Sequence, residues 1–177
     1  MPVPFPLPDI RVKYRGVFDY DNLMHSMRQW IVDSGYEFEE LQYKHKVPSP
    51  AGYEQEIRWR AWRKVTGYVR YSIFIFFHIW DIKDLDVIKD NKKVKMWSGR
   101  VMIEINGLVE LDWAGYFEKG NSKFLLGLRD WIHKFFMFNK IMGGYTDEHY
   151  YRMYKLHLVA KQALGMTTIT DSSRYRY

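Results

Sequence analysis

The chain has 177 residues, no cysteine and a formal charge of +6, from 27 Lys+Arg and 21 Asp+Glu. The lack of cysteine excludes disulfide scaffolds, thiolate metal centres and cysteine nucleophiles, and the 47% hydrophobic and 18% aromatic content excludes a disordered chain. A single domain of this size buries roughly 70% of its unfolded surface. No stretch is long enough to cross a bilayer, and the start MPVPFPLPD lacks a signal peptide's cationic segment, so we expect a cytoplasmic protein without membrane insertion.

The first ten residues predict an extended arm. Prolines at positions 2, 4, 6 and 8 alternate with Val3, Phe5 and Leu7, and proline lacks the N–H that helices and strand ladders use. We therefore expect a polyproline-like segment that pairs with no strand. It is either a loose terminus or an arm docked on a neighbour through Phe5 and Leu7.

Residues 11–18 alternate as a strand, and a helix is predicted to follow them. Asp19 or Asp21 suits its N-cap, apolar residues then recur at helical spacing, and Gly35 supplies a left-handed stop. The next predicted strand covers residues 38–47 and ends at the proline-rich turn 48–52.

Three turn signals divide residues 53–114 into four strands of a predicted antiparallel meander. They are Thr66-Gly67, Asp90-Asn91 and Asn106-Gly107, of which the last is the strongest signal for a type I′ hairpin turn. Counting from two-residue turns at the first two predicts a core face of Ile57, Trp59, Phe74, Phe76, Trp80, Val101, Ile103 and Ile105. The other face then carries a second apolar stripe, Tyr71, Ile73, Ile75, Phe77 and Ile79, which needs cover from this chain's own helices or tails, or from a partner or ligand.

Two helices are predicted after the sheet. The first covers residues 121–141 and ends at Gly143-Gly144; the second begins at Thr146 and ends at Gly165. The predicted organisation is an extended proline-spaced arm over 1–10, a single α+β domain over 11–165 and a flexible basic-aromatic tail over 166–177.

The predicted fold class is α+β: an antiparallel meander sheet of five or six strands, one helix after the first strand, and two C-terminal helices packed on the sheet. Over residues 11–142 this order of elements resembles the helix-grip folds of the START and Bet v 1 type, in which a curved sheet wraps a long C-terminal helix around an apolar cavity. The resemblance implies an apolar small molecule between sheet and helix. For such a cavity the candidate ligand-binding residues are His78, Trp97 and Trp131.

No motif for catalysis or metal binding is present in the sequence. GxSxG, SxxK and phosphate-binding glycine loops are absent, and the surroundings of His78, FIFFHIW, are typical of a neutral core histidine. His149 and His157 lie about 12 Å apart on one predicted helix, too far to share a metal. We therefore predict no metal and no cofactor, and favour a non-catalytic function.

Basic and aromatic residues alternate in four stretches: KYR at 13–15, RWRAWRK at 58–64, YVRY at 68–71 and RYRY at 174–177. Arginine contacts phosphates while tyrosine and tryptophan stack on bases, as single-stranded nucleic acid requires. The same residue types anchor protein interfaces. Glu54 and Glu56, beside Arg58 and Arg60, weigh against nucleic acid.

The leading hypothesis is a non-catalytic binding or assembly protein that contributes an apolar sheet face and its N-terminal arm to a homo- or hetero-oligomer. The predicted partner-binding residues are Phe5, Leu7, Arg58, Arg60, Trp62, Tyr71, Ile73, Ile75 and Phe77. The alternatives are a carrier or sensor of an apolar small molecule in a helix-grip cavity and a protein that binds RNA or single-stranded nucleic acid.

Overall fold

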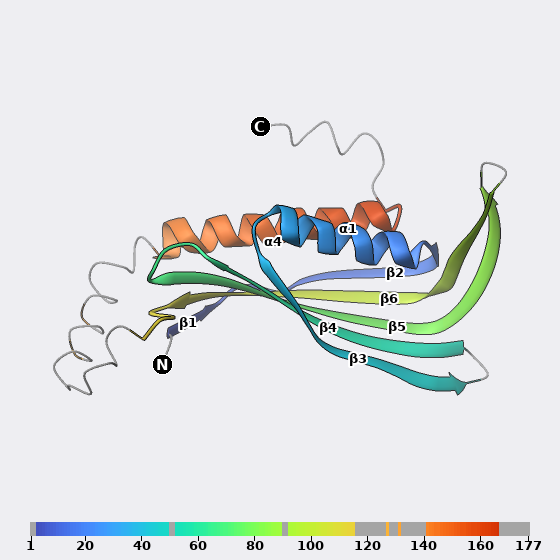
Figure 1. Ribbon diagram of the computed structural model, residues 1–177, viewed down its shortest axis with the longest axis horizontal. Helices are drawn as coiled ribbons and strands as arrows, with labels where there is room; N and C mark the ends of the chain where they lie inside the picture. Colours follow the sequence, from blue (N-terminus) through green and yellow to red (C-terminus); the bar gives the residue numbers. More distant parts are fainter. Residues whose placement is uncertain are drawn as a thin grey trace.

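The computed structural model describes residues 3–49, 52–89, 92–115, 127, 131 and 141–166. Within these ranges, six strands form one antiparallel sheet and two α-helices lie on one of its faces (Figure 1). The predicted α+β class and strand number are confirmed. The elements, in chain order, are β1 (Val3–Pro6), β2 (Ile10–Phe18), α1 (Tyr20–Asp33), β3 (Glu37–Ser49), β4 (Gly52–Lys64), β5 (Val69–Lys89), β6 (Lys92–Leu111), the π-helical turn η2 (Ile141–Tyr145) and α4 (Thr146–Ala163).

The strand order is β1-β6-β5-β4-β3, and β2 also pairs with β6. β2 lies along the middle of β6, from Trp97 to Ile105, and β1 lies along its last residues, so both N-terminal strands pair with β6. In the described part of the chain, no helix is long and apolar enough to span a bilayer. The tail from residue 167, and all of the helix predicted over 121–141 except residues 127, 131 and 141, lie outside the described residues.

The proline-spaced arm is a strand of the sheet, so the prediction that its prolines prevent pairing is wrong. The Leu7 N–H donates to the carbonyl of Gly107 at 2.9 Å. Backbone N–H and C=O groups point alternately to the two sides of a strand. Those of Val3 and Phe5 therefore also point toward β6, whereas those of Pro4 and Pro6 point away from it, where no N–H is needed. Val3, Phe5 and Leu7 pack half-buried against the core, so the chain's own sheet takes up the arm.

The core lies between the sheet and the two helices. Asp19 caps α1 by accepting from the Asn22 N–H at 2.9 Å, and Gly35, with φ of 76°, follows its end, as predicted. The helices bury Leu23, Met27, Ile31, His149, Met153, Leu156 and Ala160. The sheet contributes Ile57, Trp59, Ala61, Tyr71, Ile73, Ile75, Phe77, Ile79, Val101, Ile103 and Ile105.

β5 presents to the core the face opposite to the one that hairpin counting predicts. A two-residue turn at Thr66-Gly67 would pair Lys64 with Val69. In the structure Lys64 pairs with Arg70, so the connection contains one extra residue on the β5 side. A one-residue slip moves every side chain of a strand to the other face. The three predicted core residues of β5, Phe74, Phe76 and Trp80, therefore face away from the helices. The stripe from Tyr71 to Ile79 lies in the core, where this chain's own helices cover it.

A β-bulge supplies the second offset. Lys89 pairs with Lys92, as a two-residue turn at Asp90-Asn91 predicts, but the register shifts between Trp80 and Lys83. The backbone of Asp81 is left-handed, with φ of 54°, and Gly99 faces the bulge so closely that a Cβ there would lie 2.8 Å from the Trp80 carbonyl oxygen. Beyond the bulge, the ends of β5 and β6 bend toward the helix side of the sheet (Figure 1).

The third predicted hairpin is also wrong, because Asn106 and Gly107 lie inside β6. Residues 53–111 thus form three strands and not four. A Cβ on Gly107 would collide with the Met153 side chain of α4 and would lie 3.0 Å from Leu7 Cδ1. The glycine therefore serves the close approach of a helix to the sheet. Gly143 and Gly144 lie in η2, which leads directly into α4.

Candidate functional site on the open sheet face

The sheet face opposite the helices, here called the open face, is not covered by any element of the described part of the chain (Figure 1). A column of four rings runs along β5 on this face: Phe74, Phe76, His78 and Trp80, each half-buried. On the β4 side of this aromatic column lie Arg58, Arg60 and Trp62. On the β6 side lie Arg100 and Met102.

Strand alternation explains this arrangement. In RWRAWRK, Trp59 and Ala61 point into the core, so Arg58, Arg60 and Trp62 must point outward. β5 alternates in the same way between buried aliphatic or aromatic residues and the outward column. Because both faces of β5 are apolar, the strand reads from the sequence as a continuous apolar run that does not reveal its orientation.

Guanidinium groups pack over the rings of the aromatic column. The Arg58 Cζ lies 5.2 Å from the ring centroid of Phe76, and the Arg60 Cζ lies 5.8 Å from that of Phe74. Arg60 also lies over Trp62, at 5.3 Å. These are cation–π distances, and the contacts hold the two guanidinium groups against the rings of the face.

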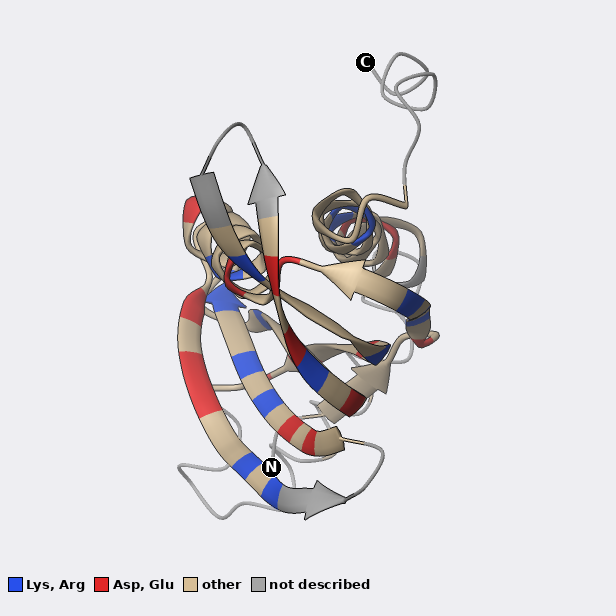
Figure 2. Ribbon diagram, turned by 90° about the vertical axis from the view of Figure 1, so that its right-hand side faces the viewer, with Lys and Arg blue, Asp and Glu red and all other residues tan. Residues whose placement is uncertain are grey.

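The carboxylates beside the column have cationic partners. Glu104 pairs with Arg11 at 3.0 Å, and Glu110 pairs with Arg70 at 2.8 Å. Lys46 bonds both Glu54 and Glu56, and together with His78 it lowers the pKa of Glu54. On the edge strand β3, Glu39 lies opposite Arg60 of β4 in register. Figure 2 shows that acidic segments of β3 lie beside basic segments of β4 and the reverse.

Several cations of this face differ, because no described carboxylate lies within ion-pair distance of them. They include Lys13 and Arg15 on β2 and Arg58 and Arg60 on β4. Arg60 turns toward the rings of Phe74 and Trp62 and makes no ion pair with Glu39. The open face therefore combines half-buried rings with cations that are available to an anion.

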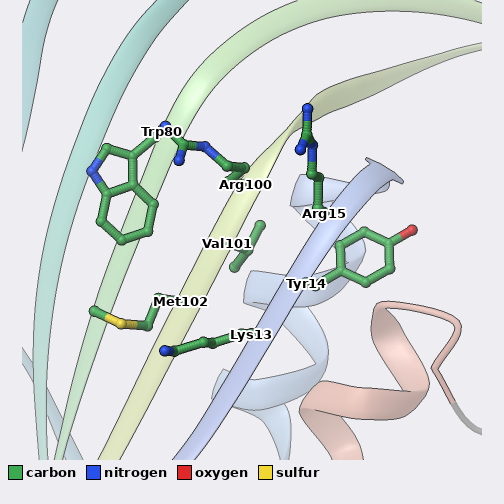
Figure 3. Close-up of a pocket in the computed structure, with 7 residues that line it drawn as sticks. All are labelled: Lys13, Tyr14, Arg15, Trp80, Arg100, Val101 and Met102. Atoms are coloured by element: carbon green, nitrogen blue, oxygen red, sulfur yellow. The ribbon is translucent and has the colours of Figure 1, made fainter.

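A pocket of about 590 Å³ lies where β2, β6 and β5 meet (Figure 3). Arg15 lies directly opposite Arg100, which reaches over the Trp80 ring at 5.7 Å and pairs with Asp81 at 2.6 Å. The residues that line the pocket are Lys13, Tyr14, Arg15, Trp80, Arg100, Val101 and Met102. Three cations, a thioether and an indole around one hollow suit a flat aromatic group that carries negative charge.

Beside this pocket, Glu54, Glu56 and His78 bring three candidate ligand atoms within 4.8 Å of one another. His78 Nε2 contacts Glu54 Oε1 and lies 3.8 Å from Glu56 Oε1. His78 is thus a half-buried residue of the open face, and its expected place in the core is wrong. Within the described residues, this is the group that has the donor atoms to hold a metal ion.

The three predicted ligand-binding residues are not brought together. His78 lies on the open face, whereas Trp97 lies on the helix side and stacks on Tyr20 with ring centroids 3.9 Å apart. Trp131 is 50% exposed. The helix-grip resemblance in element order therefore does not place these residues around one ligand.

The predicted partner-binding residues fall into three places. Arg58, Arg60 and Trp62 lie on the open face, and Phe5 and Leu7 lie on the chain's own sheet. The other four, Tyr71, Ile73, Ile75 and Phe77, are at most 1% exposed. Hairpin counting missed Phe74, Phe76 and Trp80 as open-face residues, and the left-handed Asp81 gave no signal in the sequence.

Comparisons of the chain with protein-family models, with curated proteins and with solved structures give no match.

Proposed function

We propose that the open face binds single-stranded nucleic acid. The observation that carries this proposal is the column of half-buried rings on β5, flanked by arginines that have no carboxylate partner among the described residues. Bases stack on aromatic side chains whatever their sequence, and each such contact contributes about 1–3 kcal/mol. Successive rings of the column are two residues apart on one strand, which leaves each ring room for its own base.

The charges of the face support the same function. Lys13, Arg15, Arg58 and Arg60 are available to phosphates, and the chain as a whole carries +6 with a pI of about 9.3. Glu54 and Glu56, which weigh against nucleic acid in the sequence, are held by Lys46 and His78. They therefore present less free negative charge to a backbone than their number suggests.

The assembly hypothesis loses most of its residues to the core. Its apolar stripe from Tyr71 to Phe77 is covered by α1 and α4, and its arm is paired with β6. Arg58, Arg60 and Trp62 are the members that stay accessible, and they serve nucleic acid equally well.

The test measures binding of a fluorescent 12-nucleotide RNA and of the same sequence as a duplex, by anisotropy at several salt concentrations. We expect a preference for the single strand. Four phosphate contacts give a log–log salt slope of about −3 and a loss of roughly 50-fold in affinity between about 50 and 200 mM salt. The double variant Arg58→Ala/Arg60→Ala should reduce that slope by about 1.4.

Two further variants sharpen the test. Phe76→Ala removes a stacking ring and should weaken binding about tenfold at every salt concentration without changing the slope. Lys155→Ala removes one exposed positive charge from α4, on the other side of the sheet, and should change neither the RNA affinity nor the salt slope. Wild-type affinity in the double arginine variant, or equal affinity for the single strand and the duplex, would overturn the proposal.

A further inference from the structure

We propose that Glu54, Glu56 and His78 form a binding site for one divalent transition-metal ion, of the Zn²⁺ or Mn²⁺ type, on the open face. This inference goes beyond nucleic-acid binding and does not depend on it. An imidazole nitrogen with two carboxylates suits transition metals, whereas Mg²⁺ and Ca²⁺ prefer oxygen ligands alone.

Strand geometry brings the three ligands together. Glu54 and Glu56 are two residues apart on β4 and so share a face. His78 is the direct cross-strand partner of Glu56 on β5. All three are rooted in paired strands near the middle of the sheet, which is a rigid base for a site. No short spacing in the sequence announces them, because the ligands come from two strands.

The separations of the donor atoms fit a metal ion. Ligand atoms bound at about 2.1 Å in a tetrahedral site lie about 3.4 Å from one another. His78 Nε2 lies 3.8 Å from Glu56 Oε1 and contacts Glu54 Oε1, and all three donor atoms lie within 4.8 Å. Small side-chain rotations therefore suffice to place the three donors around one ion.

Lys46 shows that the two carboxylates converge on one cation. Its Nζ lies 3.1 Å from Glu54 Oε1 and 2.7 Å from Glu56 Oε1. Both carboxylates therefore turn toward the same positively charged group. The Lys46 side chain is 49% exposed and swings into solvent when a divalent ion takes its place.

The ring of Trp80 orients the nitrogen ligand. Its centroid lies 3.7 Å from that of His78, so it limits rotation of the imidazole. The His78 side chain is 18% exposed and that of Glu56 16% exposed, which shields the site while leaving access from the open face. Met102, opposite His78 on β6, lines the pocket of Figure 3, so the ion would sit beside that pocket.

The experiment is calorimetric titration of the metal-free full chain with Zn²⁺ and with Mn²⁺, in the absence of nucleic acid. We expect one ion per chain. His78→Ala and Glu56→Gln should each weaken binding by roughly 100-fold or more. Lys46→Ala should tighten it several-fold because it removes the competing ammonium, and this gain cannot arise from misfolding. Lys44→Ala is the matched control: it removes a nearby charge that forms no ion pair in the described structure and should leave the affinity within about twofold.

Absence of one-to-one binding, or wild-type affinity in His78→Ala, would overturn the metal site. Equal affinities of Lys46→Ala and the wild type would also overturn it, since the ion would then bind elsewhere. None of these results bears on RNA binding, which the anisotropy experiment measures in metal-free buffer.

Discussion

His149 is a buried histidine whose two ring nitrogens both have partners. Nε2 lies 3.0 Å from the Ser72 carbonyl oxygen, to which it donates, and Nδ1 lies 3.4 Å from the Tyr36 hydroxyl, from which it accepts. The ring stacks on Tyr71 with centroids 4.4 Å apart. Burial lowers the pKa of His149 to about 4, so the neutral ring is part of the core at physiological pH.

Acid is therefore expected to destabilise the fold through His149. Its folded pKa lies below the unfolded value of 6.5, so the unfolded chain takes up a proton first as the pH falls. The stability that the neutral ring provides is complete above pH 6.5 and is lost as the pH falls toward about 4, by about 3 kcal/mol. Urea unfolding of wild type and His149→Gln between these pH values checks this: the difference in stability should shrink as the pH falls, and a constant difference would contradict the expected role of His149.

Arg70 is expected to be the most costly surface-facing cation to remove. It binds Glu110 through two bonds, of 2.8 and 2.9 Å, and Ser72 donates to the same carboxylate at 2.6 Å. Burial acts to raise the pKa of Glu110, but these bonds outweigh it and the pKa is lowered. Arg70→Met leaves the carboxylate buried and unpaired, at a cost of roughly 3 kcal/mol in chemical denaturation.

Two variants serve as controls for Arg70. Arg11→Met breaks two ion pairs, with Asp9 and Glu104, in which Arg11 is 56% exposed, and should change stability by less than about 1 kcal/mol. Arg70→Met/Glu110→Leu removes both charges and should recover most of the loss. An effect of Arg70→Met as small as that of Arg11→Met would contradict the expected role of the buried pair.

Among the elements, β5 offers the clearest test of the register. Phe77 is fully buried beneath the helices, and its neighbour Phe76 faces outward beneath Arg58. Phe77→Ala should destabilise the fold by about 3–5 kcal/mol and Phe76→Ala by about 1 kcal/mol. Thermal and chemical unfolding of the two variants measure these losses. A larger loss for Phe76→Ala than for Phe77→Ala would indicate the register of a two-residue turn.

The contact between α4 and β6 is limited by Gly107. An added methyl group there meets the Met153 side chain, so Gly107→Ala should cost about 1–3 kcal/mol by overpacking. In a Met153→Ala background the same change should cost almost nothing, because the space is already vacated. A double-mutant cycle measures this coupling, and simple additivity of the two changes would show that the helix does not press on this residue.

At the scale of the whole molecule, the N-terminal arm ties the beginning of the chain to its last strand. Deleting residues 1–8 removes β1 and exposes the apolar core side chains against which Val3, Phe5 and Leu7 pack. The unfolding free energy should therefore fall by roughly 2 kcal/mol. Pro4→Ala, at an outward position, should change it by less than about 0.5 kcal/mol. Unchanged stability after the deletion would mean that the arm is not paired in solution.

The general architecture follows from local signals in the sequence, but the composition of the open face depends on the exact number of residues in each turn and bulge. The cap at Asp19, the stop at Gly35 and the alternation of RWRAWRK could be predicted because each rests on nearby residues. The outward column on β5 could not, because an apolar run on both faces hides its orientation and one extra residue in a turn reverses it. The bulge at Asp81 and the use of Gly107 depend on contacts with Gly99 and Met153 that are distant in the sequence.

The alternating prolines of β1 also decide what can add to this edge of the sheet. Pro4 and Pro6 point their nitrogens outward, so at these positions the free edge offers carbonyl acceptors and no donors. A strand from another molecule would leave its own carbonyls unpaired there, which discourages edge-to-edge aggregation. The residues that deny this strand a second partner are the same ones that conceal, in the sequence, that it has a first.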